Sequence, residues 1–363
     1  MSWGDHGTGI VRGKRWLYES GTRVPLIMRF PEKFRHLAPA TPGSVGTRLV
    51  CFIDLAATML SLAGLPVPGH MQGTPFLGRE ARQPREYVFF IRDRMDEAYD
   101  CIRSVRGTRF RYIRNFYPHI PYDQYNQYLY KERSAQAWHR LAGTLGGPPA
   151  LFMRSEKPIE ELFDTESDPE EIHDLASTPE YRSTLFEMRQ RLNAWMLETR
   201  DLGLLDESEM LRRADGKPPM DLGRDPKFYD LQRILETANL PLEGEASVSE
   251  LLTRLNDPDS AVRYWAAHGL AIVKPSAERA KAPLAAALND PCPSVRVAAA
   301  HALCRLDCRE QALAALEKEL SGDDKYVRIR ALNVLALQQK KAAILHERCH
   351  PYGPRKNMIY RNS

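Results

Sequence analysis

The sequence lacks closely spaced cysteines, an excess of charge and a long apolar run. Its six cysteines form no C-x-x-C pair, which argues against a zinc ribbon and against a dense disulfide scaffold. The 51 basic side chains face 47 acidic ones, and the net charge of +4 argues against nucleic-acid binding over the whole chain. The longest apolar stretch, 49–65, is interrupted by Asp54 and is too short to span a membrane. The first residues lack the basic start and apolar run of an export signal, so the compartment stays open.

A chain of 363 residues and 41.4 kDa is long enough for two or three domains. Residues 24–30, VPLIMRF, form a nearly continuous apolar run, entered through Pro25, that predicts the edge or start of a buried strand. Residues 49–63 place apolar side chains at helical spacing, and Gly64 with Pro66 ends the pattern. A strand followed by a helix predicts an α/β layer over residues 1–80.

Residues 81–200 predict a smaller α+β subdomain. Short strands are expected between 87 and 116, with Gly107-Thr108 as a hairpin connection. A helix over 178–196 closes this part, with Thr178 as its N-cap and apolar side chains along one face. Residues 201–245 predict a linker that carries one short helix.

The last third contains an internal repeat, because 256–273 matches 289–306 and 322–337 follows in weaker form. Val-Arg pairs recur every 32 or 33 residues. Each unit predicts two helices, with Asp257 and Asp290 as caps of the second helix. The pattern resembles HEAT repeats and predicts an all-α solenoid over 246–340, followed by a tail over 341–363. Such surfaces most often bind other macromolecules, so a protein partner is possible.

An Asp5-His6 pair between glycines opens the chain, and Lys14 follows nine positions after Asp5. A carboxylate oxygen and an imidazole nitrogen can reach one divalent ion, and flanking glycines keep the backbone close. The spacing alone is more typical of an ordinary turn than of a metal site. The segments that follow in the sequence favour the metal interpretation of this pair.

Four segments in this order resemble the C-terminal part of type I sulfatases of the alkaline phosphatase superfamily, and most closely sulfoglucosamine sulfohydrolase-like members. They are GDHG with GKRWLYESGTRVPLIMRFP (4–31), FIDLAATMLSLAGLPVPGHMQG (52–73), RSVRGTRFRYIRNF (103–116) and KPIEELFDTESDPEEIHDLASTPEYR (157–182). The resemblance implies hydrolysis of sulfate esters or sulfamates, with a formylglycine made in a C-x-P-S-R motif and a calcium ion. It assigns Asp5 and His6 to the metal and Lys14 to a sulfate oxygen.

The resemblance also implies that the nucleophile and two further metal ligands lie upstream of Asp5, so we expect a truncated sulfatase that is inactive alone. The expected substrates are sulfated carbohydrates, and the expected location is periplasmic, extracellular or lumenal. Two alternatives stay open: a non-catalytic interaction protein that uses the solenoid, and a phosphoesterase of the same superfamily.

Several other patterns have a structural interpretation beside a functional one. Cys292 to Arg296 loosely matches a formylglycine motif, but its place in a repeat predicts a structural role. His301, Cys304 and Cys308, with Cys349 and His350 further on, are favoured as structural over a metal site. Arginines at 103, 106, 109, 111 and 114, followed by five tyrosines, predict a solvated strand edge or, alternatively, an anionic sugar subsite. His70 and His119 lie in loops that could face a substrate. The acidic run over 156–174 predicts a solvated surface.

Overall fold

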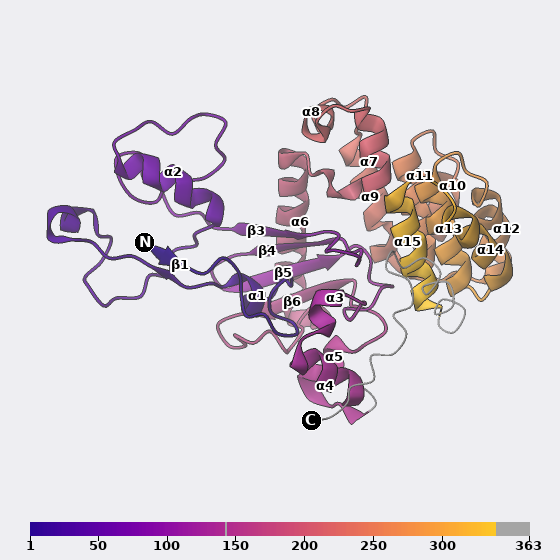
Figure 1. Cartoon of the computed structure of the whole chain (residues 1–363), viewed down its shortest axis with the longest axis horizontal. Coiled ribbons are helices and arrows are strands. Elements are labelled where there is room, and N and C mark those ends of the chain that lie inside the picture. The colour runs from indigo at the N-terminus through magenta and orange to yellow at the C-terminus, as the bar shows by residue number, and fades with distance from the viewer. Residues whose placement is uncertain (142–143, 339–363) are drawn as a thin grey trace, which may run out of the picture.

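The computed structural model describes residues 1–141 and 144–338, and its elements divide into a mixed first half and a helical second half (Figure 1). The first half is built on a four-stranded antiparallel sheet with the order β3-β4-β5-β6. Its strands are β3 (Val88–Arg92), β4 (Ile102–Arg106), β5 (Phe110–Asn115) and β6 (Glu160–Asp164). The predicted hairpin at Gly107 is confirmed, since β4 pairs β5 from Arg106↔Arg111 to Ile102↔Asn115.

The two faces of the sheet carry different layers, because successive side chains of a strand point to opposite faces. Val105, Tyr112 and Leu162 belong to one core with helix α6 (Arg182–Thr199). The buried face of α6 includes Leu185, Met188 and Leu192, as the sequence predicted, although the helix begins after a 3-10 turn at Pro179–Tyr181. The other face packs on a second core that includes Trp16, Tyr18 and Phe152, beside α3 (Gln127–Tyr130), α4 (Arg133–Leu141) and α5 (Gly147–Phe152).

Strand β6 corrects part of the prediction of a solvated acidic surface over 156–174, although Glu156, Glu166 and Glu170 are exposed. All five residues of β6 are buried, and Glu171 is buried as well. Arginines pair with several of these carboxylates: Arg189 with Glu160, and Arg111 with Glu171. Hydrophobic pattern alone could not reveal this, because the partners lie on other elements.

The N-terminal 80 residues contain little regular structure beyond short elements. β1 (Ser2–Trp3) pairs antiparallel with β2 (Leu26–Ile27), and α1 (Glu19–Thr22) lies in the connection between them. A 3-10 helix at Glu32–Leu37 and α2 (Phe52–Leu62) follow. The buried strand predicted over 24–30 is wrong in extent and burial, since β2 has two residues and Ile27 is 66% exposed.

Helix α2 buries its polar side, which also differs from the prediction. Asp54 accepts hydrogen bonds from the backbone N–H groups of Cys51 (2.8 Å) and Thr74 (2.7 Å), and this fixes the loop that follows the helix against that side. Phe52, Ile53 and Met59 are exposed as a result. In Figure 1, α2 lies away from the four-stranded sheet.

Residues 201–245 form packed helices, where the sequence predicted a linker with a single short helix. They comprise a 3-10 turn at Leu202–Leu204, α7 (Glu207–Ala214), α8 (Pro219–Gly223), α9 (Leu231–Asn239) and a 3-10 segment at Leu240–Ser247. Leu204, Tyr229 and Leu231 are fully buried. These residues belong to one hydrophobic core that runs from the sheet into the last third of the chain.

Three helix pairs follow, as the repeat predicted. They are α10 (Val248–Arg254) with α11 (Ser260–Val273), α12 (Ala277–Ala287) with α13 (Pro293–Arg305), and α14 (Arg309–Glu319) with α15 (Lys325–Leu337). The Val-Arg pairs have a structural role: the valines are buried, and Arg263 and Arg296 bridge to Asp290 and Glu319 of the next helix pair. Within the described ranges, no helix has the length and apolar character that crossing a bilayer demands.

The predicted helix caps of the repeats need correction. Asp257 and Asp290 accept from the backbone N–H groups of Asp259 (2.9 Å) and Cys292 (2.8 Å), so each aspartate closes a turn before the helix. The N-cap lies two residues later, at Asp259 in α11 and at Cys292 in α13. The Asp-Pro sequence favours this turn over an immediate helix start.

Candidate functional site

The segment that carries Asp5, His6 and Lys14 is a closed loop. Its backbone is tied together at three places, by Gly4 N to Pro25 O (3.1 Å), Gly7 N to Gly21 O (3.1 Å) and Lys14 N to Thr8 O (2.6 Å). Gly7 is required by the close approach, because a Cβ there would lie 2.1 Å from a backbone oxygen of the opposite limb. The loop therefore holds its functional side chains by backbone contacts.

Asp5 and His6 lie at the surface, with side chains 87% and 42% exposed. The His6 Nδ1 is 2.7 Å from the Gly7 carbonyl oxygen, which can only accept, so in the neutral ring the proton lies on Nδ1 and the lone pair on Nε2. That Nε2 lies 3.7 Å from Asp5 Oδ1. The pair thus presents one carboxylate oxygen and one imidazole nitrogen on the same side of the loop.

The donor set of this pair fits part of a calcium site. Calcium takes about six to eight oxygen ligands, and this pair supplies one carboxylate and one nitrogen. Within residues 1–141 and 144–338, no further histidine, cysteine or carboxylate joins Asp5 and His6 in a cluster of metal-binding side chains. The pair is consistent with a shared site that needs additional oxygen ligands.

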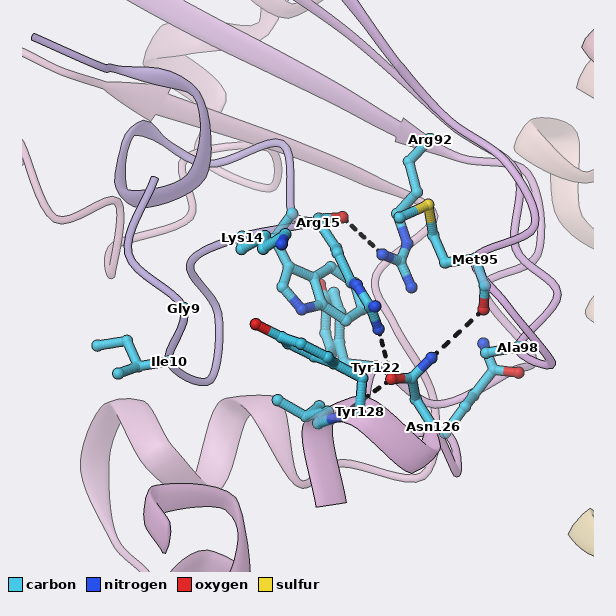
Figure 2. A pocket seen from close by; sticks show the side chains of 13 residues that line it. Gly9, Ile10, Lys14, Arg15, Arg92, Met95, Ala98, Tyr122, Asn126 and Tyr128 are labelled. Carbon is cyan, nitrogen blue, oxygen red and sulfur yellow. Dashed lines mark hydrogen bonds between the residues drawn. The ribbon is translucent and has the colours of Figure 1, made fainter. Parts of the chain in front are cut away.

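Lys14 lies in a pocket between the loop and α3, together with Arg15, Arg92 and Asn126 (Figure 2). Its Nζ lies 5.1 Å from the ring centroid of Tyr128. The two arginines are already committed, because Arg15 pairs with Asp96 (2.7 Å) and Arg92 donates to the Arg15 carbonyl oxygen. Lys14 makes no ion pair with the part of the chain that the structure describes, so its charge is available to a ligand.

Arg111 anchors this loop to the sheet. Its guanidinium donates to the Leu17 carbonyl oxygen (2.8 Å), to Glu171 Oε1 (2.6 Å) and to Glu19 of α1. Burial raises the pKa of Glu171, and the attraction of Arg111 opposes that rise. For Glu19 the balance is reversed: burial disfavours the carboxylate, yet Arg111 and Arg106 hold its pKa below the ordinary value.

The arginine-rich hairpin corrects both interpretations drawn from the sequence for three of its five arginines, while Arg109 is half exposed. Arg103, Arg111 and Arg114 are fully buried, so they form neither a solvated edge nor a sugar subsite. Arg103 bridges Asp201 (2.6 Å) and Asp93 (2.9 Å), and Arg114 donates to the backbone carbonyl oxygen of Ala238 (3.0 Å). Sequence could place these residues on strands but could not show which carboxylates and carbonyl groups surround them.

The two loop histidines have different environments. His70 is exposed in the loop after α2, and its role as a substrate contact stays a prediction. The expected position of His119 is corrected, because its side chain is 3% exposed and lies against the helical repeats beside His268 and His301. A substrate-facing position is incompatible with that burial. The sequence indicated two of these three histidines, since His268 and His301 occupy equivalent repeat positions, but nothing in it connected them with His119.

The cysteine motif at 292–296 is a repeat position, as the sequence predicted. Cys292 is the buried N-cap of α13, and its Sγ lies 3.5 Å from Glu209 Oε2. Burial, reinforced by the charge of Glu209, raises the pKa of this thiol to about 11. Of the other cysteines and histidines weighed as metal ligands, Cys304 is buried in the repeat core, Cys308 is the N-cap of α14, and Cys349 and His350 lie outside the described residues.

The high thiol pKa predicts that Cys292 is unreactive in the folded protein. With iodoacetamide at pH 8, we expect its alkylation to be about a hundredfold slower in the native chain than in the same chain in urea, because less thiolate is present. Peptide mass spectrometry over time measures both rates, with the half-buried Cys51 as internal control. Equal native and unfolded rates at Cys292 would contradict the buried, protonated thiol.

Two family descriptions match the chain. "N-sulphoglucosamine sulphohydrolase, C-terminal" matches residues 4–135, and "HEAT repeats" matches residues 248–336. An ulvan-active sulfatase of Formosa agariphila is 38% identical over 230 residues, which cover 62% of this chain and 37% of the relative. The N-sulphoglucosamine sulphohydrolase of Homo sapiens is 27% identical over 213 residues, which cover 54% of this chain and 41% of the relative.

The chain therefore spans about two fifths of the length of these curated relatives. Among solved structures, a 2-O GAG sulfatase is similar at a TM-score of 0.38 and 23% identity, over 55% of this chain and 36% of that one. The two family matches fall on the mixed first half and on the repeats, which are the two parts that the structure joins through one core.

Proposed function

Because this chain joins a sulfatase C-terminal region to HEAT repeats, we propose that it contributes an anion-binding and metal-binding loop to the hydrolysis of sulfated carbohydrates. The observation that carries the proposal is Lys14, a pocket-lining cation with no carboxylate partner among the described residues. A sulfate group is the ligand that the family match suggests for that charge. We use "sulfatase region" below for residues 1–200.

The pocket around Lys14 supports a ligand that is both anionic and cyclic. Lys14 offers a compact positive charge that can offset negative charge on sulfuryl oxygens as the bond to sulfur breaks. Tyr128 lies beneath it and is exposed, so a sugar ring can stack there. Arg15 and Asn126 brace the floor of the pocket through their hydrogen bond.

Asp5 and His6 would supply two of the ligands of a divalent cation, and calcium is the ion expected from the family. When bound, such an ion polarises a substrate oxygen and stabilises developing negative charge. The residues around the pair would position its ligand atoms. The Gly7 carbonyl oxygen fixes the tautomer of His6, and the backbone hydrogen bonds of the loop keep Asp5 beside it.

The proposed activity requires a nucleophile from outside these residues. The sequence contains no C-x-P-S-R motif, and the loose match at Cys292 is a buried helix cap. We therefore expect the isolated polypeptide to hydrolyse neither a sulfate ester nor a phosphate ester. A sulfatase rate from the pure chain would overturn this part of the proposal, and a preference for phosphate would favour the phosphoesterase alternative. A protein partner for the repeats stays a prediction.

Lys14→Ala is expected to weaken binding of a sulfated monosaccharide about ten- to a hundredfold, which is the range for losing one charge-assisted contact. Isothermal titration of the full chain with the sugar, at fixed ionic strength, measures the change. Lys33→Ala is the matched control, because Lys33 is an exposed lysine of the same region. Equal affinities for the two variants would remove Lys14 from the site.

A further inference from the structure

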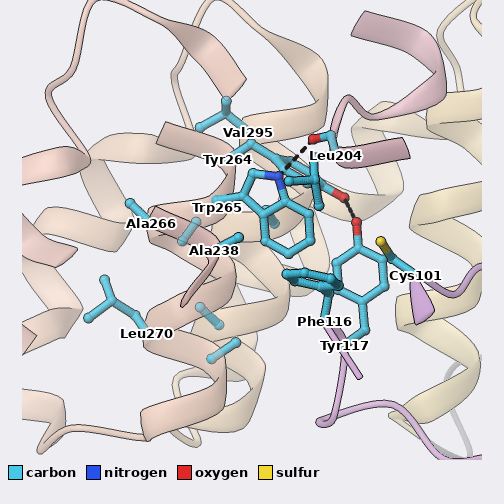
Figure 3. Packing of buried hydrophobic residues seen from close by; sticks show 14 of the residues in the cluster. Cys101, Phe116, Tyr117, Leu204, Ala238, Tyr264, Trp265, Ala266, Leu270 and Val295 are labelled. Atoms are coloured by element: carbon cyan, nitrogen blue, oxygen red, sulfur yellow. Dashed lines mark hydrogen bonds between the residues drawn. The ribbon is translucent and has the colours of Figure 1, made fainter. Parts of the chain in front are cut away.

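The sulfatase region and the HEAT repeats meet in a buried aromatic junction. Trp265 of α11 stacks on Tyr117, with ring centroids 5.2 Å apart, and donates from its indole nitrogen to the Leu204 carbonyl oxygen at 2.7 Å (Figure 3). Tyr117 and Tyr264 share a hydrogen bond between their hydroxyl groups at 2.6 Å. Beside this stack lies the one group of three histidines that the structure brings together within its described ranges.

The three histidines come from three elements on both sides of the junction. His119 belongs to the loop after β5, His268 to α11 and His301 to α13. All three are buried, and their nearest ring nitrogens lie within 4.8 Å of one another. The ring centroid of His119 is 4.8 Å from that of His301 and 5.2 Å from that of His268.

A directed chain of hydrogen bonds fixes the protons of two of these rings. Arg330 lies 3.0 Å from His268 Nε2, and a guanidinium has no acceptor, so Nε2 must accept. The proton of His268 is then on Nδ1, which donates to His119 Nε2 at 3.2 Å. His119 consequently carries its own proton on Nδ1, which has no hydrogen-bond partner in the described part of the chain.

A second proton on either ring breaks this chain. On His268 it would go to Nε2 and face the N–H of Arg330, while on His119 it would go to Nε2 and face the N–H of His268. Each case replaces a hydrogen bond by two opposed donors inside a buried site. The neutral cluster is therefore compatible with the closed junction, and the charged cluster is not.

The charged groups around the cluster act in the same direction. Arg330 of α15, Arg305 of α13 and Lys157, which precedes β6, all place positive charge near the rings. The neighbouring carboxylates are already engaged by these cations, since Asp206 faces Arg330, Glu156 pairs with Arg305 and Asp100 pairs with Lys157. The surrounding tyrosines, Tyr99, Tyr117 and Tyr264, are neutral at physiological pH because burial raises the pKa of each. No carboxylate of the described residues forms an ion pair with the three imidazoles.

Three clustered imidazoles are also typical of a zinc site, but the hydrogen bonds of these rings argue against zinc binding. Zinc requires a lone pair from each ring at about 2.0–2.1 Å. Both nitrogens of His268 are used, one as acceptor from Arg330 and one as donor to His119. Two guanidinium groups beside the cluster would also repel a divalent cation.

We propose that His119, His268 and His301 form an acid-sensitive latch that holds the sulfatase region against the HEAT repeats when neutral and releases it when protonated. This inference does not depend on the proposed sulfatase activity. The nearest analogues in chemistry are interfaces switched by buried histidines.

The direction of the pH effect follows from linkage. Burial, followed by the neighbouring positive charges, lowers the pKa of all three histidines in the closed state, that of His301 to about 3. In the open state each returns to an ordinary pKa of about 6.5. The open state therefore binds more protons below pH 6.5, so the closed state is fully stable above that pH and loses stability as the pH falls. Between pH 7.5 and 5.5 each histidine shifts the opening equilibrium about tenfold, and three shift it about a thousandfold.

Hydrogen-exchange mass spectrometry on the full chain tests the latch. Peptides covering 116–122 and 260–273 report opening of the junction, and peptides from α6 report the rest of the fold, at pH 7.5 and 5.5 after correction for the intrinsic exchange rate. We expect protection at the junction to fall about a thousandfold while that of α6 changes much less. His301→Gln should reduce the pH effect about tenfold. Unchanged protection of the wild-type junction at pH 5.5 would overturn the latch.

Two further results separate the latch from a purely structural role and from a metal site. His173→Gln, at an exposed histidine, should keep the full pH dependence. If His301→Gln weakens the junction equally at both pH values, the histidines only pack and the proposal fails. Stoichiometric zinc binding by the wild-type chain at pH 7.5, lost in His301→Gln, would also replace the latch by a metal site.

Discussion

Replacing Trp265 by alanine is expected to lower the free energy of unfolding by about 3–5 kcal/mol, the range for removing a buried large aromatic side chain. Trp265 is fully buried, stacks on Tyr117 and meets Phe116 edge-on at 5.7 Å. Its removal also leaves the Leu204 carbonyl oxygen without a donor in a site closed to water. Urea denaturation followed by far-ultraviolet circular dichroism measures the loss.

The matched control for Trp265 is Phe186→Ala, because Phe186 is 57% exposed on α6. Its effect should be small. Trp265→Phe tests the hydrogen bond separately, since phenylalanine keeps a ring against Tyr117 but cannot donate to Leu204. If Trp265→Ala unfolds the repeats alone and leaves the sheet at its original midpoint, the two halves are independent domains and the shared core is not cooperative.

Replacing Arg111 by methionine is expected to cost about 3–5 kcal/mol, because one partner of a buried ion pair is removed and the other keeps its charge. Glu171 is almost completely buried and relies on Arg111 for compensation, and Glu19 loses its principal partner at the same time. The α1 loop should loosen from the sheet as a consequence. Denaturant unfolding at pH 7 measures the stability, and titration with a sulfated sugar measures the loop.

The pH dependence of the Arg111 variant gives a second readout. Without Arg111, burial raises the folded-state pKa of Glu171 further, so its charged form opposes folding above that pKa and its neutral form does not. The deficit relative to wild type should therefore shrink as the pH is lowered from 7 toward 5. Arg309→Met, at an exposed ion pair, is the control and should show little change at either pH. A pH-independent deficit would mean that lost packing, not charge, dominates.

The sequence predicted the elements whose information is local. The repeat period located three helix pairs, a Gly-Thr turn located the β4–β5 hairpin, and the apolar stripe of α6 identified its buried face. Asp5, His6 and Lys14 lie in one short segment of the sequence, and backbone hydrogen bonds close that segment into a loop. Their roles toward metal and sulfate stay predictions.

Two of the errors share one physical origin, which is charge buried through partners distant in sequence. The acidic strand β6 and Arg103, Arg111 and Arg114 look hydrophilic along the chain. In space each charge meets a partner on another element: Arg189 pairs with Glu160 of β6, Arg103 pairs with Asp201 and Arg111 pairs with Glu171. Arg114 meets the backbone carbonyl group of Ala238, so none of these buried charges is left uncompensated. The prediction of a linker over 201–245 was wrong for a different reason. The helices there are short and become stable only by packing on the core.

By itself the sequence determined the segments: a glycine-bounded Asp-His loop with its lysine, an antiparallel hairpin, and a repeated helical pair, since each depends on residues close together in the chain. Only the tertiary structure decided that these segments share one hydrophobic core and that His119 meets His268 and His301 across it. Periodicity encodes which face of an element is apolar, but the identity of the opposing surface depends on contacts between residues some 150 positions apart.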